Sequence, residues 1–351
     1  MEKEKDKEKI LEATIKQLEK NYGKGIVMRL VDRAKVQVPT VSSGSISLDY
    51  ALGIGGYPKG RIIEIYGQEA SGKTTLALMA IAEVQKLGGS VLFIDAEHAF
   101  EPKYAKTIGV DTEDKKFLIS QPEYGEQALS ILEDAIRGGA IDLVVVDSVA
   151  ALVTKAELEG EMEEQGIGGQ ARLMSKALRK LTGLIAKTGT IAIFINQVRE
   201  KISQNPYGGP PETTPGGRAL KFYSSIRLEV KKGESIKGPN NEIIGHYIKV
   251  KVVKNKLAPP YKTAEFELIY GKGINKIGEI FDLAVNMGII KRSGSWYSFN
   301  SEQLGQGKEK ALEYIQENEE ILRKIETEVR EKLKEYKPQG GEYGTTSEQT
   351  E

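Results

Sequence analysis

The segment RIIEIYGQEASGKTTLALMAIAEV (residues 61–84) joins an apolar strand-like run to an apolar helix-like run through a glycine-rich turn. Its centre, GQEASGKTT, matches G-x-x-x-x-G-K-[ST] in the strand–loop–helix order that this pattern requires. Glycines let such a loop wrap closely, so that backbone N–H groups point at phosphate oxygens. The segment therefore predicts a nucleoside triphosphate site within an α/β fold.

Side chains of the loop and of a later strand complete the predicted site. Lys73 is expected to bring a positive charge to the β- and γ-phosphates, and the Thr74 hydroxyl to ligate Mg²⁺. Asp147 ends the apolar run DLVVVD (142–147), and the end of a strand is where α/β sheets place ligands. We interpret Asp147 as a second Mg²⁺ contact, made through water, rather than as a helix cap. The loop residues expected to contact the nucleotide are Gly67, Gln68, Glu69, Ala70, Ser71, Gly72, Lys73, Thr74 and Thr75.

Apolar runs that alternate with helical stretches extend the α/β pattern. They lie at residues 61–66, 91–95, 142–147 and 191–196. Such runs predict a central, mostly parallel sheet covered by helices on both faces. The later segments HYIKVKVVKN (246–255) and KTAEFELIY (262–270) alternate polar with apolar residues, as antiparallel strands with one solvated face do.

A charged helix precedes this core, to which we assign residues 37–270. Residues 1–36 carry an apolar stripe from Leu11 to Tyr22 at helical spacing. A terminal helix has little of its own to pack on. We therefore expect it to dock on the core or on another subunit.

A small α/β domain is expected after the core, at residues 271–337. It contains a predicted Ser-Gly hairpin turn in IIKRSGSWYSF (289–299) and two charged helices, the second with an apolar face from Leu322 to Leu333. Residues 338–351 are rich in glycine and polar side chains, which predicts a disordered tail.

The composition excludes several classes of protein. The chain has 351 residues, 50 Lys+Arg, 50 Asp+Glu and no cysteine. Without cysteine there is no disulfide scaffold, thiolate metal site or Cys nucleophile, and we expect a cytoplasmic protein. No apolar stretch approaches the ~20 residues that span a bilayer, so no membrane partner is expected. Zero net charge excludes a globally basic nucleic-acid binder, so any DNA contact must be local or created by assembly.

Hydrolysis of a triphosphate requires a residue that orients water in line with the γ-phosphate. Asp95, Glu97 and His98 follow the run 91–95 and are the candidates. Alternation along an extended chain would put Asp95 and Glu97 on one face, so spacing leaves both open. His98 and His246 are the only histidines, and we predict structural roles for them because neither has a metal-ligand partner at suitable spacing.

Several segments resemble the bacterial RecA recombinase family, in unbroken order over most of residues 8–335. They include FIDAEHAFEPKYA (93–105), IAIFINQVR (191–199), PGGRALKFYSSIRL (215–228) and GINKIGEIFDLAV (273–285). The resemblance implies a RecA-type P-loop ATPase core with a central, mostly parallel sheet. It also implies an N-terminal helix for polymerisation and a small α/β C-terminal domain that gathers duplex DNA.

The resemblance also implies an activity. A member of the family is a Mg²⁺-dependent, DNA-dependent ATPase that forms filaments with ATP on single-stranded DNA. It carries out homologous pairing and strand exchange with double-stranded DNA in recombinational repair, and stimulates autocleavage of the LexA repressor in the SOS response. The expected partners are therefore single- and double-stranded DNA, further copies of the chain and a LexA-type repressor.

Roles for individual residues follow from the same resemblance. It implies that Glu97 activates water, that Gln197 senses the γ-phosphate and that Tyr104 stacks on adenine. It also implies that Lys254 and Lys256, in VVKNK (252–256), reach the ATP of an adjacent protomer. Without the resemblance, these two lysines would be expected to face solvent.

Two segments, about 157–171 and 198–217, are too long and glycine-rich for routine connections. The resemblance implies that they line the filament axis and hold single-stranded DNA. Five glutamates of the first loop would repel phosphate, so contacts are expected from residues that follow them. Positions 172, 175 and 179 share one helix face. The implied DNA-contacting residues are Ile167, Arg172, Ser175, Arg179, Arg199, Lys201, Ile202, Gly216, Gly217 and Arg218.

Two other classes share the predicted ATPase core. One is a ring-forming helicase or motor, which processive unwinding in a closed hexamer would reveal. The other is a nucleotide-gated scaffold without turnover, against which the presence of Glu97 argues.

Overall fold

In a computed structural model, the chain is described at residues 2–27, 38–160, 168–200, 212–238 and 240–335. Its contacts divide it into two units, Met1–Pro39 and Thr40–Glu351. The described part of the first unit contains α1 (Glu2–Tyr22), which confirms the predicted N-terminal helix. Ile10, Leu11 and Tyr22 are exposed on it, so the apolar stripe remains open within this unit.

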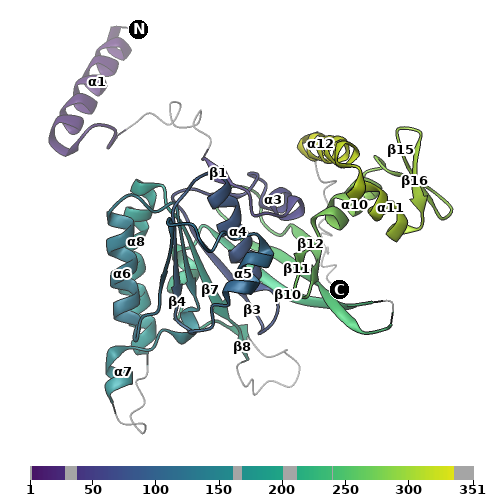
Figure 1. The fold of residues 1–351 in the computed structure, drawn as a ribbon. Helices are drawn as coiled ribbons and strands as arrows, with labels where there is room; N and C mark the ends of the chain where they lie inside the picture. Colours follow the sequence, from purple (N-terminus) through teal and green to yellow (C-terminus); the bar gives the residue numbers. More distant parts are fainter. Residues whose placement is uncertain (1, 28–37, 161–167, 201–211, 239, 336–351) are drawn as a thin grey trace, which may run out of the picture. The chain divides into compact units, whose positions relative to one another are not determined.

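The second unit is built on a sheet that has nine strands among the described residues (Figure 1). The order across the sheet is β13-β12-β11-β10-β3-β7-β6-β4-β5. The strands from β10 to β5 in this order run parallel, and β11, β12 and β13 add to β10 in antiparallel fashion. Their bounds are β3 (Ile62–Gly67), β4 (Val91–Asp95), β5 (Phe117–Ser120), β6 (Leu143–Asp147), β7 (Ile191–Gln197), β10 (Ile226–Lys237), β11 (Ile243–Asn255), β12 (Thr263–Ile269) and β13 (Gly273–Ile274).

The burial of these strands follows their sequence patterns. The apolar runs in β4 and β6 are buried throughout, because helices cover both faces there. In β12, every second residue is buried, as its alternating pattern predicted. The predicted mostly parallel sheet with an antiparallel extension is therefore confirmed. The short strand β5 was not predicted, and Leu118 and Ile119 in it are about half exposed.

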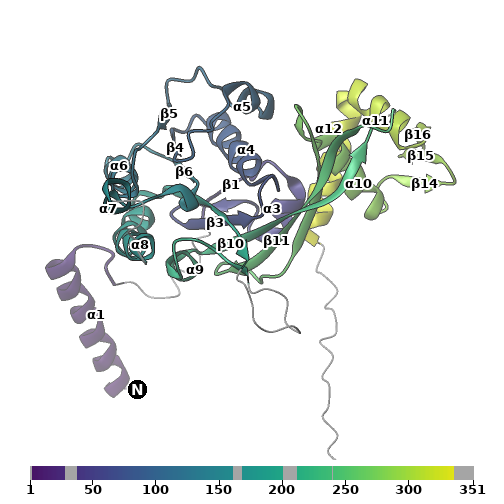
Figure 2. The ribbon, with the colours of Figure 1, turned by 90° about the horizontal axis from the view of Figure 1, so that it is seen from below.

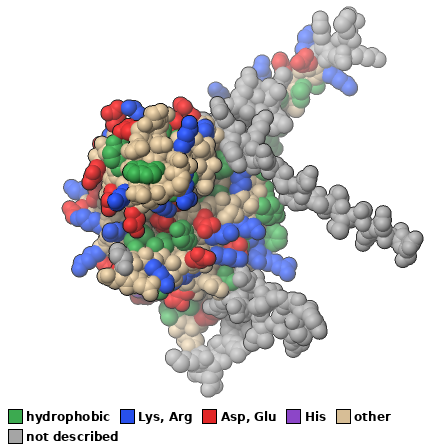
Figure 3. Space-filling model, turned by 90° about the vertical axis from the view of Figure 1, so that its right-hand side faces the viewer, with side chains coloured by type: hydrophobic (Ala, Val, Ile, Leu, Met, Phe, Trp, Pro, Cys, Tyr) green, Lys and Arg blue, Asp and Glu red, His purple; other side chains and the backbone are tan. Residues whose placement is uncertain are grey.

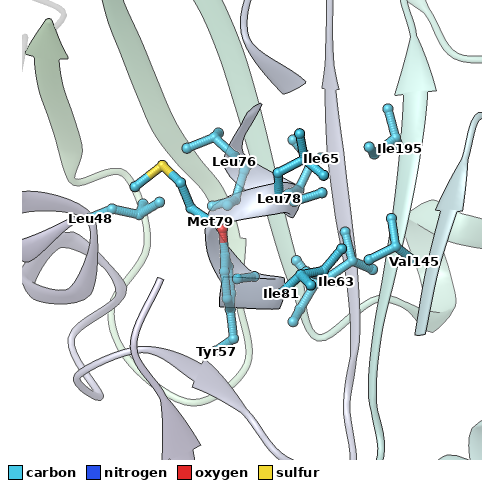
Figure 4. Packing of buried hydrophobic residues seen from close by; sticks show 14 of the residues in the cluster. Leu48, Tyr57, Ile63, Ile65, Leu76, Leu78, Met79, Ile81, Val145 and Ile195 are labelled. Carbon is cyan, nitrogen blue, oxygen red and sulfur yellow. The ribbon is translucent and has the colours of Figure 1, made fainter. Parts of the chain in front are cut away.

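Helices pack against both faces of the sheet (Figure 2). On one face, α3, α4 and α5 enclose the larger apolar core, part of which is shown in Figure 4. On the other face, α6, α8 and α9 enclose a second core. The bounds are α3 (Ile46–Leu52), α4 (Lys73–Lys86), α5 (Pro102–Ile108), α6 (Gly125–Arg137), α8 (Gly169–Thr188) and α9 (Ala219–Tyr223).

Short elements complete the central part of the unit. β1 (Thr40–Val41) pairs with β2 (Tyr57–Pro58), and β8 (Arg199–Glu200) pairs with β9 (Glu212–Thr213) at the base of the second long loop. The 3₁₀ helix η1 (Val149–Ala151) and α7 (Lys155–Glu159) precede the first long loop.

The predicted hairpin and charged helices are present at the C-terminal end of the unit. α10 (Lys276–Asn286) precedes a three-stranded antiparallel sheet of β14 (Lys291–Ser293), β15 (Trp296–Phe299) and β16 (Glu302–Gln306). α11 (Lys308–Glu317) and α12 (Glu319–Glu335) follow. Together they form a third apolar core, in which Ile325 and Val329 of α12 are fully buried.

The short helix α3 is held at both ends. At its N-terminus, the carboxylate of Glu279 in α10 accepts hydrogen bonds from Ser45 Oγ (2.5 Å) and Ser47 N (2.9 Å). At its C-terminus, the Leu52 carbonyl accepts a hydrogen bond from Asn255 Nδ2 (2.8 Å). One short helix therefore links the C-terminal domain to the end of β11.

Charges are mixed on the surface. On the face shown in Figure 3, Lys and Arg side chains are interspersed with Asp and Glu, in line with the equal numbers of the two signs. A search of the described residues finds no helix with the length and apolar character needed to cross a membrane.

Glu279→Ala should lower the free energy of unfolding by about 2 kcal/mol, because the buried Ser45 hydroxyl and Ser47 N–H would lose their acceptor. Chemical denaturation followed by circular dichroism measures this change. Glu331→Ala, at an exposed position of α12, is the control and should change stability by at most ~0.5 kcal/mol. If the two substitutions had equal effects, the hydrogen bonds of Glu279 to Ser45 and Ser47 would not contribute to stability.

Candidate nucleotide site and nucleic-acid interface

The glycine-rich loop lies between β3 and α4, tightly packed on neighbouring strands. A Cβ added to Gly67 would lie 2.1 Å from the Val230 carbonyl oxygen, and one added to Gly72 would lie 2.4 Å from Ile248 Cδ1. Gly72 also has φ +97°, a left-handed conformation that favours glycine. Packing against the backbone of β10 therefore dictates glycine at position 67, and backbone conformation dictates it at position 72, in addition to phosphate chemistry.

Lys73 and Thr74 open α4, and their polar atoms already have partners. Lys73 Nζ donates to the Gln68 carbonyl (2.6 Å), which folds this largely buried side chain back over its own loop. Thr74 Oγ1 donates to Asp147 Oδ2 (2.7 Å), so the loop and the end of β6 meet as predicted from their positions. A hydroxyl and a carboxylate are oxygen ligands of the kind that Mg²⁺ takes together with water and substrate phosphates. Among the described residues, no group of three or more His, Asp or Glu side chains could hold a metal on its own.

The charges of this site are shifted by burial. Burial raises the pKa of Asp147 to about 6, the Thr74 hydrogen bond opposes this, and the nearby Glu97 adds to it. Burial lowers the pKa of Lys73, and the carboxylates of Asp147, Glu97 and Glu69 oppose that shift. A cation between Thr74 and Asp147 would stabilise the ionised carboxylate, so the residues present fit a bound Mg²⁺.

Glu97 lies where the ends of β4, β6 and β7 converge. Its Oε1 accepts hydrogen bonds from Ser148 Oγ, directly after Asp147, and from Gln197 Nε2 (3.2 Å) at the end of β7. The structure therefore brings together Glu97 and Gln197, which the resemblance had assigned to hydrolysis. Ser148 was missed, because a serine after a strand has no distinguishing sequence signal.

Asp95 has a different environment from Glu97. It is 2% exposed and accepts hydrogen bonds from the backbone N–H groups of Ala99 and Phe100 (3.1 Å each) and from Gln121 Nε2 (3.0 Å). β4 ends at Asp95, and His98 has φ +54°. The chain is therefore not extended beyond Asp95, so strand alternation does not apply there, although both carboxylates line one cavity with Thr74 and Asp147.

A cavity of about 310 Å³ extends from the glycine-rich loop, and Glu97 is not among its lining residues. At its margin, Tyr104 OH is 2.7 Å from Thr75 Oγ1. His246, only 2% exposed, has Nδ1 3.3 Å from Tyr270 OH. The size and the aromatic lining suit a nucleoside. The lining residues are Ala70, Ser71, Gly72, Lys73, Thr74, Thr75, Tyr104, His246, Leu268, Tyr270 and Gly271.

Lys254 and Lys256 are not among the residues that line this cavity. Lys254 Nζ donates to the carbonyls of Lys221 (2.5 Å) and Phe222 (3.2 Å), and Lys256 Nζ donates to that of Phe222 (3.3 Å). Burial lowers the pKa of Lys254, and the neighbouring Lys256 lowers it further. The Phe222 side chain is 67% exposed beside them. The lysines therefore lie in an apolar and cationic surface area rather than at the nucleotide site of their own chain.

The residues predicted for DNA contact are only partly described. Ile167, Lys201 and Ile202 lie outside the described residues, and Arg199 is described only as part of the backbone of β8. Arg172, Ser175 and Arg179 share one face of α8, with the arginines exposed and the serine half-buried. Met174, Leu178, Leu181 and Ile185 are buried on the opposite face.

Gln170 joins the two loop regions, and the sequence analysis missed it. Its Oε1 accepts from Gly216 N (3.1 Å), and its Nε2 donates to the carbonyls of Val149 (2.7 Å) and Leu152 (3.0 Å). Gly216 and Gly217 both have positive φ, and Arg218 immediately precedes α9. The roots of the two predicted DNA loops are thus fixed to each other through one side chain.

Comparisons with known proteins match nearly the whole chain. The model of the RecA N-terminal domain matches residues 9–275, and that of the RecA C-terminal domain matches residues 278–334. The chain is 58% identical to Protein RecA of Chloroherpeton thalassium over 95% of its own length and 92% of that protein. It is 57% identical to Protein RecA of Bacillus subtilis over 93% of its own length and 92% of that protein.

A solved structure shows the same fold. The crystal structure of the RadB recombinase superposes with a TM-score of 0.50 at 24% identity, covering 67% of this chain and 98% of that one. At this level of identity the similarity concerns the fold alone. It supports the central, mostly parallel α/β core predicted from the sequence.

Asp147→Asn should stabilise the nucleotide-free protein at pH 8 and weaken its response to Mg²⁺-ATP. The wild-type carboxyl ionises near pH 3.8 when unfolded and at about 6 when folded, so wild-type stability falls as the pH rises between these values. Above pH 6 the loss is complete and amounts to at most about 3 kcal/mol, which the neutral asparagine avoids. Chemical denaturation at pH 4 and pH 8, with and without Mg²⁺-ATP, measures both effects.

The control for this experiment is Asp134→Asn, at an exposed position of α6. Its stability should follow wild type at both pH values. An Asp147→Asn protein that is less stable than wild type at pH 8 without nucleotide would contradict the role given to burial of the carboxylate.

Proposed function

The chain belongs to the bacterial RecA family, and from this membership we propose that it is a recombinase that acts on DNA with Mg²⁺-ATP. In this proposal, protomers polymerise on single-stranded DNA, pair it with homologous duplex DNA and exchange strands in recombinational repair. Hydrolysis of ATP then weakens the filament and releases the DNA.

The observation that carries the proposal is the pair of hydrogen bonds to Glu97 Oε1. One donor, Ser148, directly follows Asp147, and the other, Gln197, ends the strand that leads into the second long loop. A γ-phosphate would compete for the Gln197 amide, since charge-assisted hydrogen bonds are stronger than neutral ones. The Glu97 carboxylate would then be available to orient water and accept its proton. The Gln197 side chain would therefore respond to the bound nucleotide, and its strand leads into the second loop.

Several exposed apolar groups support self-association. β5 is the outermost strand of the sheet, and its exposed Leu118 and Ile119 make it an edge suited to pairing with another chain. Phe222 is exposed beside Lys254 and Lys256. In the proposed filament, these lysines reach the ATP of the adjacent protomer, so that transition-state charge is stabilised only after assembly.

The domains have separate tasks in this scheme. Residues 1–36 dock on a neighbouring protomer, 37–270 form the ATPase core and 271–337 gather duplex DNA, while 338–351 form the tail. Tyr104 stacks on adenine, and Lys73, Thr74 and Asp147 bind the triphosphate with Mg²⁺.

Single-stranded DNA is held through its backbone, so base pairing supplies the sequence specificity. Arg172, Ser175 and Arg179 of α8, and Gly216 to Arg218 at the second loop, make the described part of this contact. By family membership, we also propose a cytoplasmic location and stimulation of LexA-type repressor autocleavage in the SOS response.

The proposal is tested by measuring ATP hydrolysis with and without single-stranded DNA, alongside electron microscopy of the same samples. Wild type should hydrolyse ATP at least tenfold faster with DNA and form open helical filaments. Glu97→Gln should reduce the stimulated rate by about 100-fold or more, because the general base is lost, while filaments still form with ATP. Glu113→Gln, at an exposed acid, is the control. Closed hexamers that unwind duplexes would indicate a motor instead, and hydrolysis that is indifferent to DNA and to dilution would refute the proposal.

Lys256→Ala tests the contact between protomers. Nucleotide binding by dilute, unassembled protein should stay within twofold of wild type, whereas DNA-stimulated hydrolysis should fall at least tenfold because the cation supplied by the neighbour is missing. The matched control is Lys251→Ala, an exposed lysine of β11, the strand that ends directly before Lys256. Normal DNA-stimulated turnover in Lys256→Ala would exclude the role in trans.

A further inference from the structure

Glu64 is a carboxylate in the middle of the central strand β3, and none of its surface is exposed. It interrupts the otherwise apolar run of RIIEIY (61–66). Burying a carboxylate is costly unless it is paired and hydrogen-bonded. An apolar residue could fill this position of the core without that cost. We therefore looked for a function of the charge.

Both carboxylate oxygens of Glu64 have a partner on an adjacent strand. On one side, Arg227 Nε of β10 donates to Oε2 (2.5 Å), and the Arg227 guanidinium also lies 4.5 Å from the centre of the Tyr66 ring. On the other side, Asn196 Nδ2 of β7 donates to Oε1 (3.2 Å). Glu64 therefore joins three neighbouring strands through their side chains.

The connection continues towards the surface that carries the lysines. Arg227 is the direct neighbour of Lys254 in the register between β10 and β11. Lys254 in turn holds carbonyls at the end of α9. Lys254, Arg227, Glu64 and Asn196 thus form a row across four adjacent strands, which we name the cross-strand polar row.

At its other end, the row reaches both the nucleotide site and the second loop through Asn196. Asn196 Oδ1 accepts from the backbone N–H of Gln197 (3.0 Å), and its Nδ2 also donates to the Pro215 carbonyl (3.1 Å). Pro215 directly precedes Gly216, which is held by Gln170. One amide side chain therefore fixes the residue that contacts Glu97 and the root of the loop.

We propose that Glu64 is a positioning residue that couples DNA binding to ATP hydrolysis through the cross-strand polar row. It contacts neither nucleotide nor DNA itself. By holding Asn196 and Arg227 at once, it keeps Gln197, the root of the second loop and the strand of Lys254 in one fixed arrangement. The inference rests on the proposed function, in which the second loop binds DNA and Lys254 acts on a neighbour.

A charge suits this task better than an apolar side chain would. Without Glu64, Arg227 would be left with an unpaired, largely buried charge, and Asn196 would lose one of its two acceptors. Displacement of the loop root therefore strains the ion pair, and displacement of β10 strains the contact with Asn196. Residues in one such network respond together, which is the physical requirement for coupling.

The test is Glu64→Gln in the full-length chain, since glutamine keeps the size and loses the charge that pairs with Arg227. Two quantities are measured. The first is the stimulation of ATP hydrolysis by single-stranded DNA, and the second is the ratio of DNA affinities with and without a non-hydrolysable ATP analogue. Both should fall about tenfold, whereas affinity for the ATP analogue without DNA should stay within twofold of wild type.

Further variants separate positioning from general stability. Glu83→Gln is the control, because Glu83 is a partly buried acid that pairs with two lysines outside the cross-strand polar row, and it should leave both quantities unchanged. Arg227→Lys keeps the charge but loses the Nε contact, and should give a smaller loss of the same kind. If Glu64 acts through Asn196, the double variant Glu64→Gln/Asn196→Ala should lose no more coupling than the more impaired single variant.

Three outcomes would overturn the inference. Wild-type coupling in Glu64→Gln would show that the row is only structural. An equal loss of ATP affinity without DNA would show that Glu64 stabilises the nucleotide site in general. Absence of DNA stimulation in the wild-type protein would refute the proposed function itself, and is recognised before any variant is made.

Discussion

Close packing at two glycines of the phosphate loop positions the loop against the strands of the sheet. Gly67 is packed against the Val230 carbonyl and Gly72 against Ile248, so the phosphate loop is pressed onto β10 and β11. Those two strands also carry Arg227 and Lys254. The loop that would hold the triphosphate and the strand that carries Lys254 therefore belong to one continuous sheet. A side chain at Gly67 would collide with the backbone of β10, and one at Gly72 would be strained by its φ of +97°.

The sequence predicted the elements that are dominated by local pattern. Buried parallel strands, the loop from Gly67 to Thr75 and the approach of Thr74 to Asp147 all follow from apolar runs and a spaced motif. The alternating strands β11 and β12 and the C-terminal hairpin are of the same kind. Neighbouring residues carry the information for these elements, and the contact of Thr74 with Asp147 follows because parallel strands place their carboxyl ends at one edge of the sheet.

Other contacts between residues far apart in the sequence could not be predicted from the spacing of residues. Alternation could not separate Asp95 from Glu97, because the chain turns directly after β4 and hydrogen bonds from the turn occupy Asp95. The bond of Ser148 to Glu97 depends on two strand ends meeting, and the partners of Glu64 come from strands 130 or more residues away in the chain. The sequence shows Glu64 only as an acidic residue within an apolar run. This pattern indicates an unusual position but does not identify the residues that bind the carboxylate. Ile167, Lys201 and Ile202 remain predictions from resemblance alone.

Because α3 is held by Glu279 at one end and by Asn255 at the other, the C-terminal domain is not an independent appendage. Asn255 lies between Lys254 and Lys256, and its side-chain oxygen also accepts the N–H groups of Leu257 and Ala258. Besides the ion pairs of Lys276 with Glu83 and of Lys308 with Glu267, the seven-residue helix α3 thus offers a direct path from the C-terminal domain to the lysine pair. In the proposed filament, traction exerted by a captured duplex would reach the lysines at the contact between protomers through this helix.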